Sequence, residues 1–344
     1  MKVPESADVD RRFLLTGVAM LAAPRLALGQ TPTEFFKGKA IRLIVSTTAG
    51  GGYDLRGRLM ARHFGRFVPG NPQIVVENMP GGGSVVAVNY AYNVAPRDGT
   101  SICLFQRSIF TTPMLTPTGV RFELSKFNWL GSLGAENGVV VAWRDAPVKS
   151  TADMFNTELI TGMPGATMIP TVFNAIIGTK FKVISGYPGN NEVIAAMERG
   201  EVQAIGEWSW PNLKTTKAAW LADGSIRLLM QIGTERNDDL KSVPLAQDFA
   251  KSEEDTRILD IFTSPRKLAY PLVLPPDVPA DRVAVLREAF TAMSRDPEFL
   301  SDMQKAGMEG ELTSGREVGD FVIKTFGSLP ASLAQRISAF GPIQ

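Results

Sequence analysis

The sequence of 344 residues predicts an α/β protein of two lobes, each a mainly parallel sheet flanked by helices. Two observations carry this prediction. Strand-like and helix-like segments alternate between residues 40 and 106, and the same order recurs between residues 158 and 207 without detectable sequence identity. Such alternation favours parallel strands joined by right-handed crossovers. Because 44% of the residues are apolar, the chain can bury one large core or two modest ones.

The first 29 residues differ in character from the rest of the chain. Adjacent arginines precede an apolar run from Phe13 to Ala23, and small residues follow at Ala27 and Gly29. This order is typical of a secretory signal peptide, and the paired arginines resemble a twin-arginine signal. An ordinary secretory signal, a frayed helix and a membrane anchor are the alternatives. The run is shorter than the roughly 20 residues that span a bilayer, so we expect export to the periplasm and cleavage near Gly29.

The first strand-helix unit begins with "IRLIVS", whose β-branched composition indicates a strand. Three glycines follow, ahead of apolar residues at helical spacing, with Asp54 as the expected helix N-cap. The order repeats as strand "QIVVE", loop "NMPGGG", helix "VVAVNYAYNV" with Ser84 as the expected cap, and strand "SICLF". Residues 40–106 therefore predict β-loop-α-β-loop-α-β.

The second unit has the same order. "ELIT" leads into "GMPGA", helix "TMIPTVFNAII", strand "FKVIS", loop "GYPGNN", helix "EVIAAMERG" and strand "EVQAI". Glu192 suits the start of its helix and Gly200 the end. Further on, "RKLAYPLVLPPDVP" predicts a strand closed by prolines, and the segments from "ADRVAVLREAF" onward predict helices. No flexible linker separates the units, which favours a chain that crosses between lobes more than once, with a cleft between them.

Charge, cysteine and histidine content exclude several kinds of site. The formal net charge is +1, and no basic stripe is interleaved with aromatic residues, so nucleic-acid binding is not favoured. Cys103 is the single cysteine, which excludes an intrachain disulfide and a thiolate zinc site, and it is expected to be buried in a strand. His63 is the single histidine, so a Ser-His-Asp triad and a histidine metal site are excluded, and we expect His63 at a surface or boundary.

Glycine-rich or Gly-Pro loops follow four of the predicted strands, at residues 50–52, 81–83, 162–166 and 186–189. At the carboxyl ends of parallel strands, such loops expose backbone N–H groups at helix N-termini, where anions bind. Neither triple-glycine cluster fits G-x-G-x-x-G, and no P-loop motif is present, so nucleotide binding is not favoured. The four loops predict an anion site in a cleft that needs no metal or cofactor, and simple tight turns are the alternative.

Two carboxylates, an arginine and two tryptophans are further candidates. Asp54 and Glu207 fall at predicted strand exits, where a carboxylate pair suits acid-base chemistry. A helix cap for Asp54, and an amine partner or solvated strand end for Glu207, explain them better. Arg107 follows "CLFQ" and either pairs with a carboxylate or lies on the surface. Trp208 and Trp210 either line the cleft or close a core.

With these residues assembled, the chain resembles the Bug family, the periplasmic solute receptors of tripartite tricarboxylate transporters, also called TctC-like extracytoplasmic binding proteins. The resemblance lies in "IRLIVSTTAGGGYDLRGRLMA", "VVENMPGGGSVVAVNYAYNVAPRDGTSICLF", "GYPGNNEVIAAMERGEVQA" and the tail from "LVLPPDVPADRVAVLREAF" to "DPEFLSDMQKAG". The family's strand-GGxxD-helix opening, VEN-x-PG-x-G and PxDG all have counterparts here. The resemblance covers essentially the whole chain after the N-terminal segment.

The resemblance implies a two-lobed periplasmic binding protein of type II-like fold, which closes on its ligand like a Venus flytrap. The first lobe would comprise residues 30–137 and 264–344, and the second residues 138–263, after a signal peptide at 1–29. Such a receptor captures a small organic carboxylate and delivers it to a membrane permease. It is not an enzyme, and we expect a monomer.

Carried over residue by residue, the resemblance implies ligand contacts from loop backbone, small hydroxyl groups and bridging waters. The first lobe would contribute Thr48, Gly51, Gly52, Tyr53, Asp54, Gly83, Ser84, Gln106, Arg107 and Ser108. The second would contribute Gly162, Ala166, Thr167, Tyr187, Gly189, Asn190 and Glu207. The chain departs from the family where "STTAGGG" lacks a proline and "TGMPGAT" replaces a G-x-G-x-S loop. These departures leave the ligand unidentified, and the two tryptophans suggest a larger or aromatic carboxylate.

Three functions stay open at this stage. The first is a receptor for a di- or tricarboxylate, an aromatic acid or an amino acid that serves a membrane transporter. The second is a partner that presents its ligand to a membrane sensor such as a sensor kinase. The third is an exported enzyme that uses Asp54 and Glu207 as acid and base.

Overall fold

The computed structural model describes residue 1 and residues 31–164, 168–187, 190–308, 312–327 and 329–341. The predicted signal peptide lies outside these ranges, as do the predicted contacts Ala166, Thr167 and Gly189. Within these ranges, no helix is both long and apolar enough to cross a membrane.

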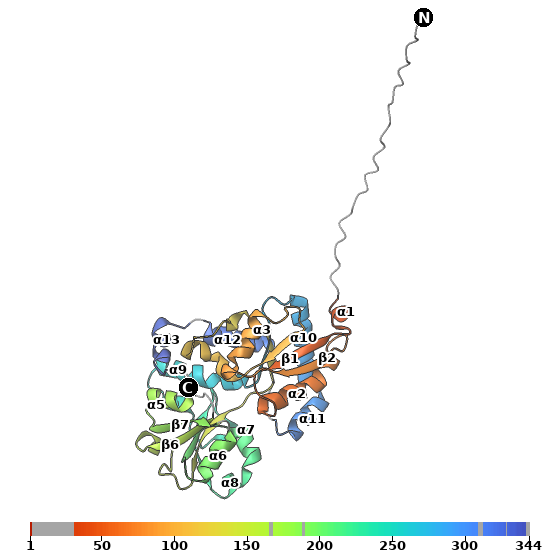
Figure 1. Ribbon diagram of the computed structural model, residues 1–344. Coiled ribbons are helices and arrows are strands. Elements are labelled where there is room, and N and C mark those ends of the chain that lie inside the picture. Colours follow the sequence, from red (N-terminus) through yellow and green to blue (C-terminus); the bar gives the residue numbers. More distant parts are fainter. Residues whose placement is uncertain (2–30, 165–167, 188–189, 309–311, 328, 342–344) are drawn as a thin grey trace.

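The first of two sheets has the strand order β11-β4-β10-β3-β1-β2. Figure 1 labels its neighbouring strands β1 and β2. Its parallel part joins β1 (Ala40–Val45) to β2 (Gln73–Asn78) and β3 (Ser101–Leu104). Three antiparallel strands extend it: β10 (Pro271–Leu274), β4 (Asn128–Ser132) and the short edge strand β11 (Thr313–Ser314). The predicted β-loop-α-β-loop-α-β unit is confirmed, and the carboxyl ends of its three strands lie at one edge of the sheet.

The second sheet has the order β7-β6-β8-β5-β9. β6 (Leu159–Pro164) is parallel to both β7 (Phe181–Tyr187) and β8 (Ala204–Ser209). β5 (Gly138–Trp143) runs antiparallel to β8 and to β9 (Ile226–Ile232). The prediction of a two-lobed α/β fold is therefore confirmed, but the expectation of mainly parallel sheets is wrong, because antiparallel strands extend each parallel unit and make both sheets mixed.

Helices bury both faces of the first sheet. Leu43 and Val45 of β1 pack in one core with α2 (Gly52–Phe64), α10 (Ala280–Ser294) and α11 (Pro297–Lys305). Ile44, between them in sequence, packs in a second core with α3 (Val85–Asn93) and α12 (Gly315–Phe326). Successive side chains of a strand point to opposite faces, so a strand covered on both faces needs consecutive apolar residues, as in Leu43, Ile44 and Val45.

The second sheet is covered in the same way. One face packs against α5 (Ile169–Ile176), α9 (Glu253–Thr263) and α13 (Ala331–Ser338). The other packs against α6 (Asn190–Glu198) and α7 (Trp210–Thr216), with α8 (Ala218–Ala222) following α7. Trp208 and Trp210 are 0% and 6% exposed and belong to this last core, so they close a core and do not line a cleft.

The chain passes between the lobes in segments that bear on the candidate site. Residues 133–137 lead from β4 to β5, and the helical turn η8 (Ser264–Leu268) leads from α9 to β10. Near the C-terminus, α13 returns to the second lobe, where Arg336 pairs with Asp255 of α9. The lobe boundaries at residues 137 and 264 stay a prediction.

Two remaining expectations concern single side chains. Cys103 is buried in β3 as predicted, and burial raises the pKa of its thiol to about 12. The expectation of a surface or boundary position for His63 is wrong, because the side chain is buried under α11 and its ring packs edge-on against Phe299. His63 Nε2 lies 3.1 Å from Asp302 Oδ2, which gives this histidine a structural role between α2 and α11.

Candidate functional site

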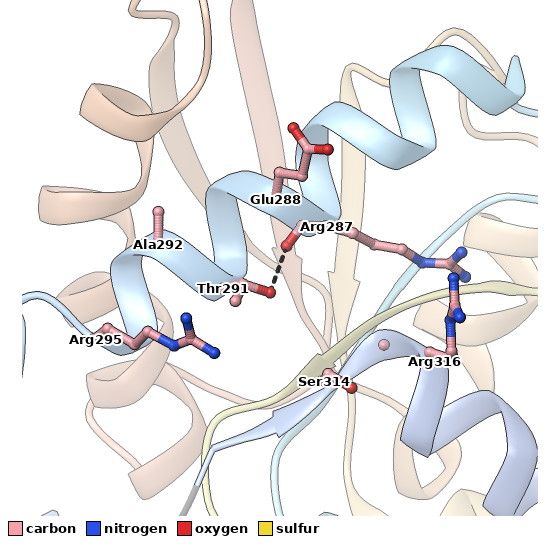
Figure 2. A pocket seen from close by; sticks show the side chains of 8 residues that line it. Arg287, Glu288, Thr291, Ala292, Arg295, Ser314 and Arg316 are labelled. Atoms are coloured by element: carbon pink, nitrogen blue, oxygen red, sulfur yellow. Dashed lines mark hydrogen bonds between the residues drawn. The ribbon is translucent and has the colours of Figure 1, made fainter.

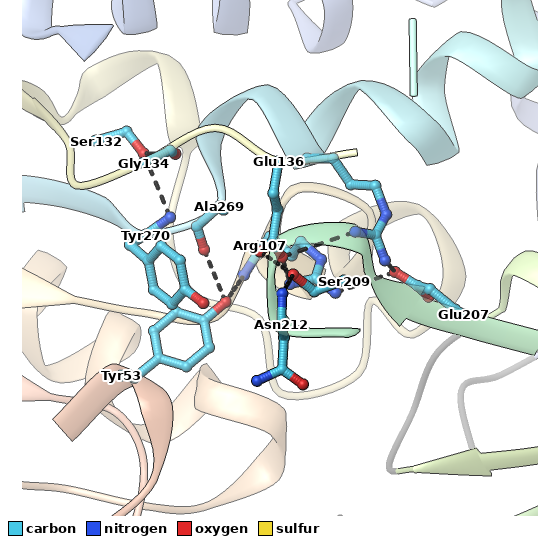
Figure 3. Close-up of polar contacts among 11 residues, drawn as sticks. Tyr53, Arg107, Ser132, Gly134, Glu136, Glu207, Ser209, Asn212, Ala269 and Tyr270 are labelled. Atoms are coloured by element: carbon cyan, nitrogen blue, oxygen red, sulfur yellow. Dashed lines mark hydrogen bonds and ion pairs between the residues drawn. The ribbon is translucent and has the colours of Figure 1, made fainter. Parts of the chain in front are cut away.

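The carboxyl ends of β3 and β8 meet where the two lobes face each other (Figure 3). Arg107 begins the turn η3 (Arg107–Phe110) just after β3, and Glu207 lies in β8. Arg107 Nη2 donates to Glu207 Oε1 at 3.0 Å. Residues separated by 100 positions in the sequence thus form a charge-assisted contact across the two lobes.

Two residues of the crossing segments complete a charge network with this pair. Arg266 of η8 pairs with Glu207, and its Nη1 lies 3.7 Å from Glu136 Oε1. Glu136 also lies 3.4 Å from Arg107 Nη1 and accepts a hydrogen bond from Ser209 Oγ at 2.6 Å. The Arg266 side chain is 2% exposed and each carboxylate 7% exposed. The network therefore keeps Arg266 and both carboxylates from solvent, while the Arg107 side chain is 29% exposed.

The Arg266 guanidinium packs closely against Gly138, and some of its N–H groups have no hydrogen-bond partner among the described residues. A Cβ at Gly138 would lie 2.4 Å from Arg266 Cζ, so the guanidinium fits only because residue 138 is glycine. Arg266 Nε and Nη1 have no hydrogen-bond acceptor among the described residues. A buried guanidinium with unpaired N–H groups can donate hydrogen bonds to additional anionic oxygens.

Arg107 remains a cation in this environment. Burial works to lower the pKa of Arg107, but Glu207, Tyr53 and Glu136 together raise it above its ordinary value. Its charge is therefore constant over any pH at which the protein is folded.

Tyr53 fixes the backbone of Arg107. Its hydroxyl accepts a hydrogen bond from the Arg107 N–H at 3.2 Å and donates to the Ala269 carbonyl at 2.9 Å. The ring packs against Tyr270 at 4.8 Å between centroids, and the Arg56 guanidinium lies 3.8 Å above Tyr270 (Figure 3 shows the two tyrosines). Burial raises the pKa of Tyr53, so the phenol stays protonated and keeps donating.

The expected helix cap at Asp54 is wrong. Gly51 is the N-cap of α2, and Asp54 lies in the first turn, where its carboxylate accepts from the Gly50 N–H at 2.8 Å. The same carboxylate accepts from Arg58 Nε and Asn78 Nδ2, each at 2.9 Å. Burial opposes ionisation, but these hydrogen bonds outweigh it and lower the pKa of Asp54 from its usual 3.8 to about 2. Asp54 therefore holds the glycine loop against β2.

We expect Asp54→Asn to lower the free energy of unfolding by about 1 to 2 kcal/mol at pH 7. Because the folded-state pKa of Asp54 lies below its unfolded value, this stabilisation is present above about pH 4 and disappears as the pH falls through about 2. Urea unfolding of both proteins between pH 2 and pH 7 measures the difference. Glu192→Gln, at an exposed carboxylate on α6, is the control. An equal loss in both variants, or a loss that persists at pH 2, would contradict the assignment.

Ser84 stands at the predicted N-cap of α3, but its hydroxyl does not cap the helix. Ser84 has a left-handed backbone with φ of 85°. Its Oγ lies 2.7 Å from Ser46 Oγ and accepts from the Gln106 N–H at 3.2 Å. The hydroxyl thus joins the ends of β1 and β3 to the second glycine loop.

The other predicted contacts lie in more varied places. In the first lobe Thr48, Gly51, Gly52 and Gly83 are exposed in the two loops, and Ser108 lies in η3. In the second lobe Gly162 lies inside β6, where a Cβ would lie 2.6 Å from Val193 of α6. Glycine at this position therefore allows α6 to pack closely on the strand. Tyr187 ends β7, and Asn190 begins α6 with a buried Oδ1 that has no partner among the described residues.

A second cluster of titratable groups lies on the first lobe. Ligand atoms of His63, Asp296 and Glu298 lie within 4.8 Å of one another. Arg66 pairs with both carboxylates, so a guanidinium already neutralises the position that a cation would take. This cluster is an ion-pair network between α2 and α11.

Comparisons with known proteins agree with this architecture. A model of the tripartite tricarboxylate transporter family receptor, TctC, matches residues 69–328. A protein of Cupriavidus necator described as a UPF0065 protein in the gbd 5′ region is 26% identical over 325 residues, covering 89% of this chain and 92% of that one.

Two solved structures show the same fold over nearly their whole length. A TctC solute-binding protein from Polaromonas, solved without ligand, has a TM-score of 0.65 at 19% identity, covering 88% of this chain and 98% of that one. A protein from R. palustris solved with adipate has a TM-score of 0.65 at 17% identity, covering 89% and 99%. Since the family match spans most of the chain and includes the charge network, this protein belongs to the TctC family of tripartite tricarboxylate transporter receptors.

Proposed function

We propose that this receptor binds a small organic carboxylate between its two lobes and delivers it, chemically unchanged, to a membrane permease. The observation that carries the proposal is the buried network in which Arg107 of the first lobe meets Glu207 of the second. The network includes Arg266, whose spare N–H groups suit carboxylate oxygens. The related R. palustris structure with adipate supports the same ligand class.

The ligand site would be completed by the loops at the carboxyl ends of the parallel strands. Exposed backbone at Gly51, Gly52 and Gly83 can approach an anion, and Thr48 adds a hydroxyl. Since these groups come from the first lobe and Glu207 from the second, closure of the lobes would enclose the ligand. The predicted moving segments are residues 30–137 with 264–344, and residues 138–263, except that α13 packs on the second sheet and would move with the second lobe.

Two observations favour a receptor over an enzyme. Asp54 is held by Arg58 and Asn78 with a pKa of about 2, which is unsuited to a general base near neutral pH. Glu207 is paired with two arginines. The N-terminal 29 residues support export to the periplasm through a signal peptide of twin-arginine type, where the receptor would meet its permease.

Calorimetric titration with adipate, malate and benzoate, each matched to its uncharged amide, tests this function. We expect at least one carboxylate to bind while its amide does not. That carboxylate should also raise the melting temperature of the protein once its concentration exceeds Kd. Failure of a broad panel of di- and tricarboxylates, aromatic acids and amino acids to bind would refute the proposal. Consumption of a bound acid, followed by mass spectrometry, would favour the enzyme instead.

A further inference from the structure

A pocket lies on the first lobe, between α10 and the start of α12 (Figure 2). It has a volume of about 480 Å³ and shares no residue with the charge network. Its lining residues are Arg287, Glu288, Thr291, Ala292, Arg295, Ser314, Gly315 and Arg316. The pocket is thus bounded by one face of α10 and by the edge strand β11 where it runs into α12.

The pocket gathers positive charge. Figure 2 shows the guanidinium groups of Arg287 and Arg316 pointing toward each other, while Glu288 points away from them. Among the described residues, neither of these arginines nor Arg295 pairs with a carboxylate, and Arg287 Nε donates to the Trp129 carbonyl at 2.8 Å. Burial and then repulsion by Arg316 lower the pKa of Arg287. The fold therefore holds like charges together, an arrangement that a bound anion would relieve.

The nearest acidic side chain on α12 is engaged elsewhere. Glu317 accepts hydrogen bonds from the Ser314 N–H and hydroxyl, while Ser314 Oγ accepts from the Glu317 N–H. This capping box fixes the start of α12 beside β11 and leaves Arg316 directed into the pocket.

The spacing of the arginines defines what fits. Arg287 and Arg295 are eight residues apart on α10, about 12 Å along the helix axis. Figure 2 shows the Arg295 guanidinium apart from the Arg287–Arg316 pair, so a small anion seated on that pair is separated from Arg295. An extended peptide rises about 3.3 Å per residue, so acidic side chains at positions i and i+4 lie about 13 Å apart on one side of the chain.

We propose that this pocket, the arginine pocket, docks an acidic, extended segment of a partner protein through two carboxylates four residues apart. Guanidinium groups suit this contact because they bind carboxylates in a bidentate manner. The surface lies outside the ligand site, so a partner such as a membrane protein can engage it whether or not the cleft is occupied.

Fluorescence anisotropy with labelled peptides tests the arginine pocket on the full chain. The probe is a nine-residue Gly/Ser peptide with two glutamates four positions apart, and its control is an isomer with adjacent glutamates. We compare R295Q/R316Q, which removes two exposed charges and leaves Arg287 in place, with R121Q/R257Q, which removes two exposed charges elsewhere.

At low ionic strength we expect R295Q/R316Q to weaken binding of the spaced peptide about tenfold and R121Q/R257Q to change it less than about twofold. The adjacent-glutamate isomer should bind more weakly to the unaltered protein. Equal effects of both double variants, equal binding of both peptides, complete competition by inorganic phosphate, or no binding at all would overturn the proposal. Carboxylate titrations on the same variants should be unchanged, which separates this result from that for the ligand site.

Discussion

Replacing Arg266 by methionine should lower the free energy of unfolding by about 3 to 5 kcal/mol, among the largest effects that a single substitution has in this protein. The guanidinium is 2% exposed and lies against Glu207 and Glu136. Methionine fills much of the same volume, so the loss arises from charge: two buried carboxylates would share Arg107 alone. Urea or thermal unfolding measures the change.

A matched substitution distinguishes the effect of losing the Arg266 charge from the effect of replacing any arginine by methionine. Arg257→Met, on the exposed side of α9, should change the free energy of unfolding by less than about 0.5 kcal/mol. The double variant R266M/E207Q removes one charge of each sign and should recover part of the loss, which a double-mutant cycle quantifies. If R266M does not fold, Gly138→Ala gives a second test, because its methyl group would displace the guanidinium. Equal stability of R266M and R257M would contradict the role assigned to the network.

The sequence was sufficient to predict the parallel units and the strand β10, but not the other strands that extend the two sheets. Units such as β1-α2-β2 are recognisable from local sequence signals. These are an apolar run of strand length, a glycine loop, and apolar residues at helical spacing. β4, β5 and β9 pair antiparallel with strands distant in sequence, and no local turn signal marks such pairing. The glycine loops and the charges Arg107 and Glu207 lie at the carboxyl ends of parallel strands, as predicted, because parallel strands end together.

The site was predicted in part for the same reason. Arg107 follows β3 and Glu207 lies in β8, both strands of the predicted units, and the two side chains meet in the structure. Glu136 and Arg266 lie in crossing segments, "GAENG" and "SPRKL", whose proximity depends on the packing of both lobes. The sequence signal for Glu136 was a single charged residue among small residues between two apolar strands. Asp54 was placed in the correct loop with the wrong partner, since its carboxylate reaches back to Gly50 and across to Asn78.

Replacing Arg107 by glutamine should weaken carboxylate binding about 30-fold or more. Its backbone is held in place by Tyr53, and its guanidinium reaches Glu207 of the second lobe, so it is positioned to bind a ligand carboxylate in the cleft. Arg107→Lys keeps the charge but loses the bidentate geometry, and it should retain part of the affinity. Calorimetric titration with a carboxylate that binds the unaltered protein measures all three. Unchanged affinity in R107Q would show that the ligand lies elsewhere.

Glu207→Gln should change the same affinity in the opposite direction. The Glu207 carboxylate already accepts from Arg107 and Arg266, so an incoming ligand carboxylate competes with it. Its neutralisation also changes the charge of the four-residue network from zero to +1. We expect affinity to rise about threefold to tenfold while the free energy of unfolding falls, because an unpaired cation is left buried. A network that only supports the fold would lose affinity in both R107Q and E207Q, so opposite signs identify Arg107 as a ligand-binding residue and Glu207 as its internal competitor.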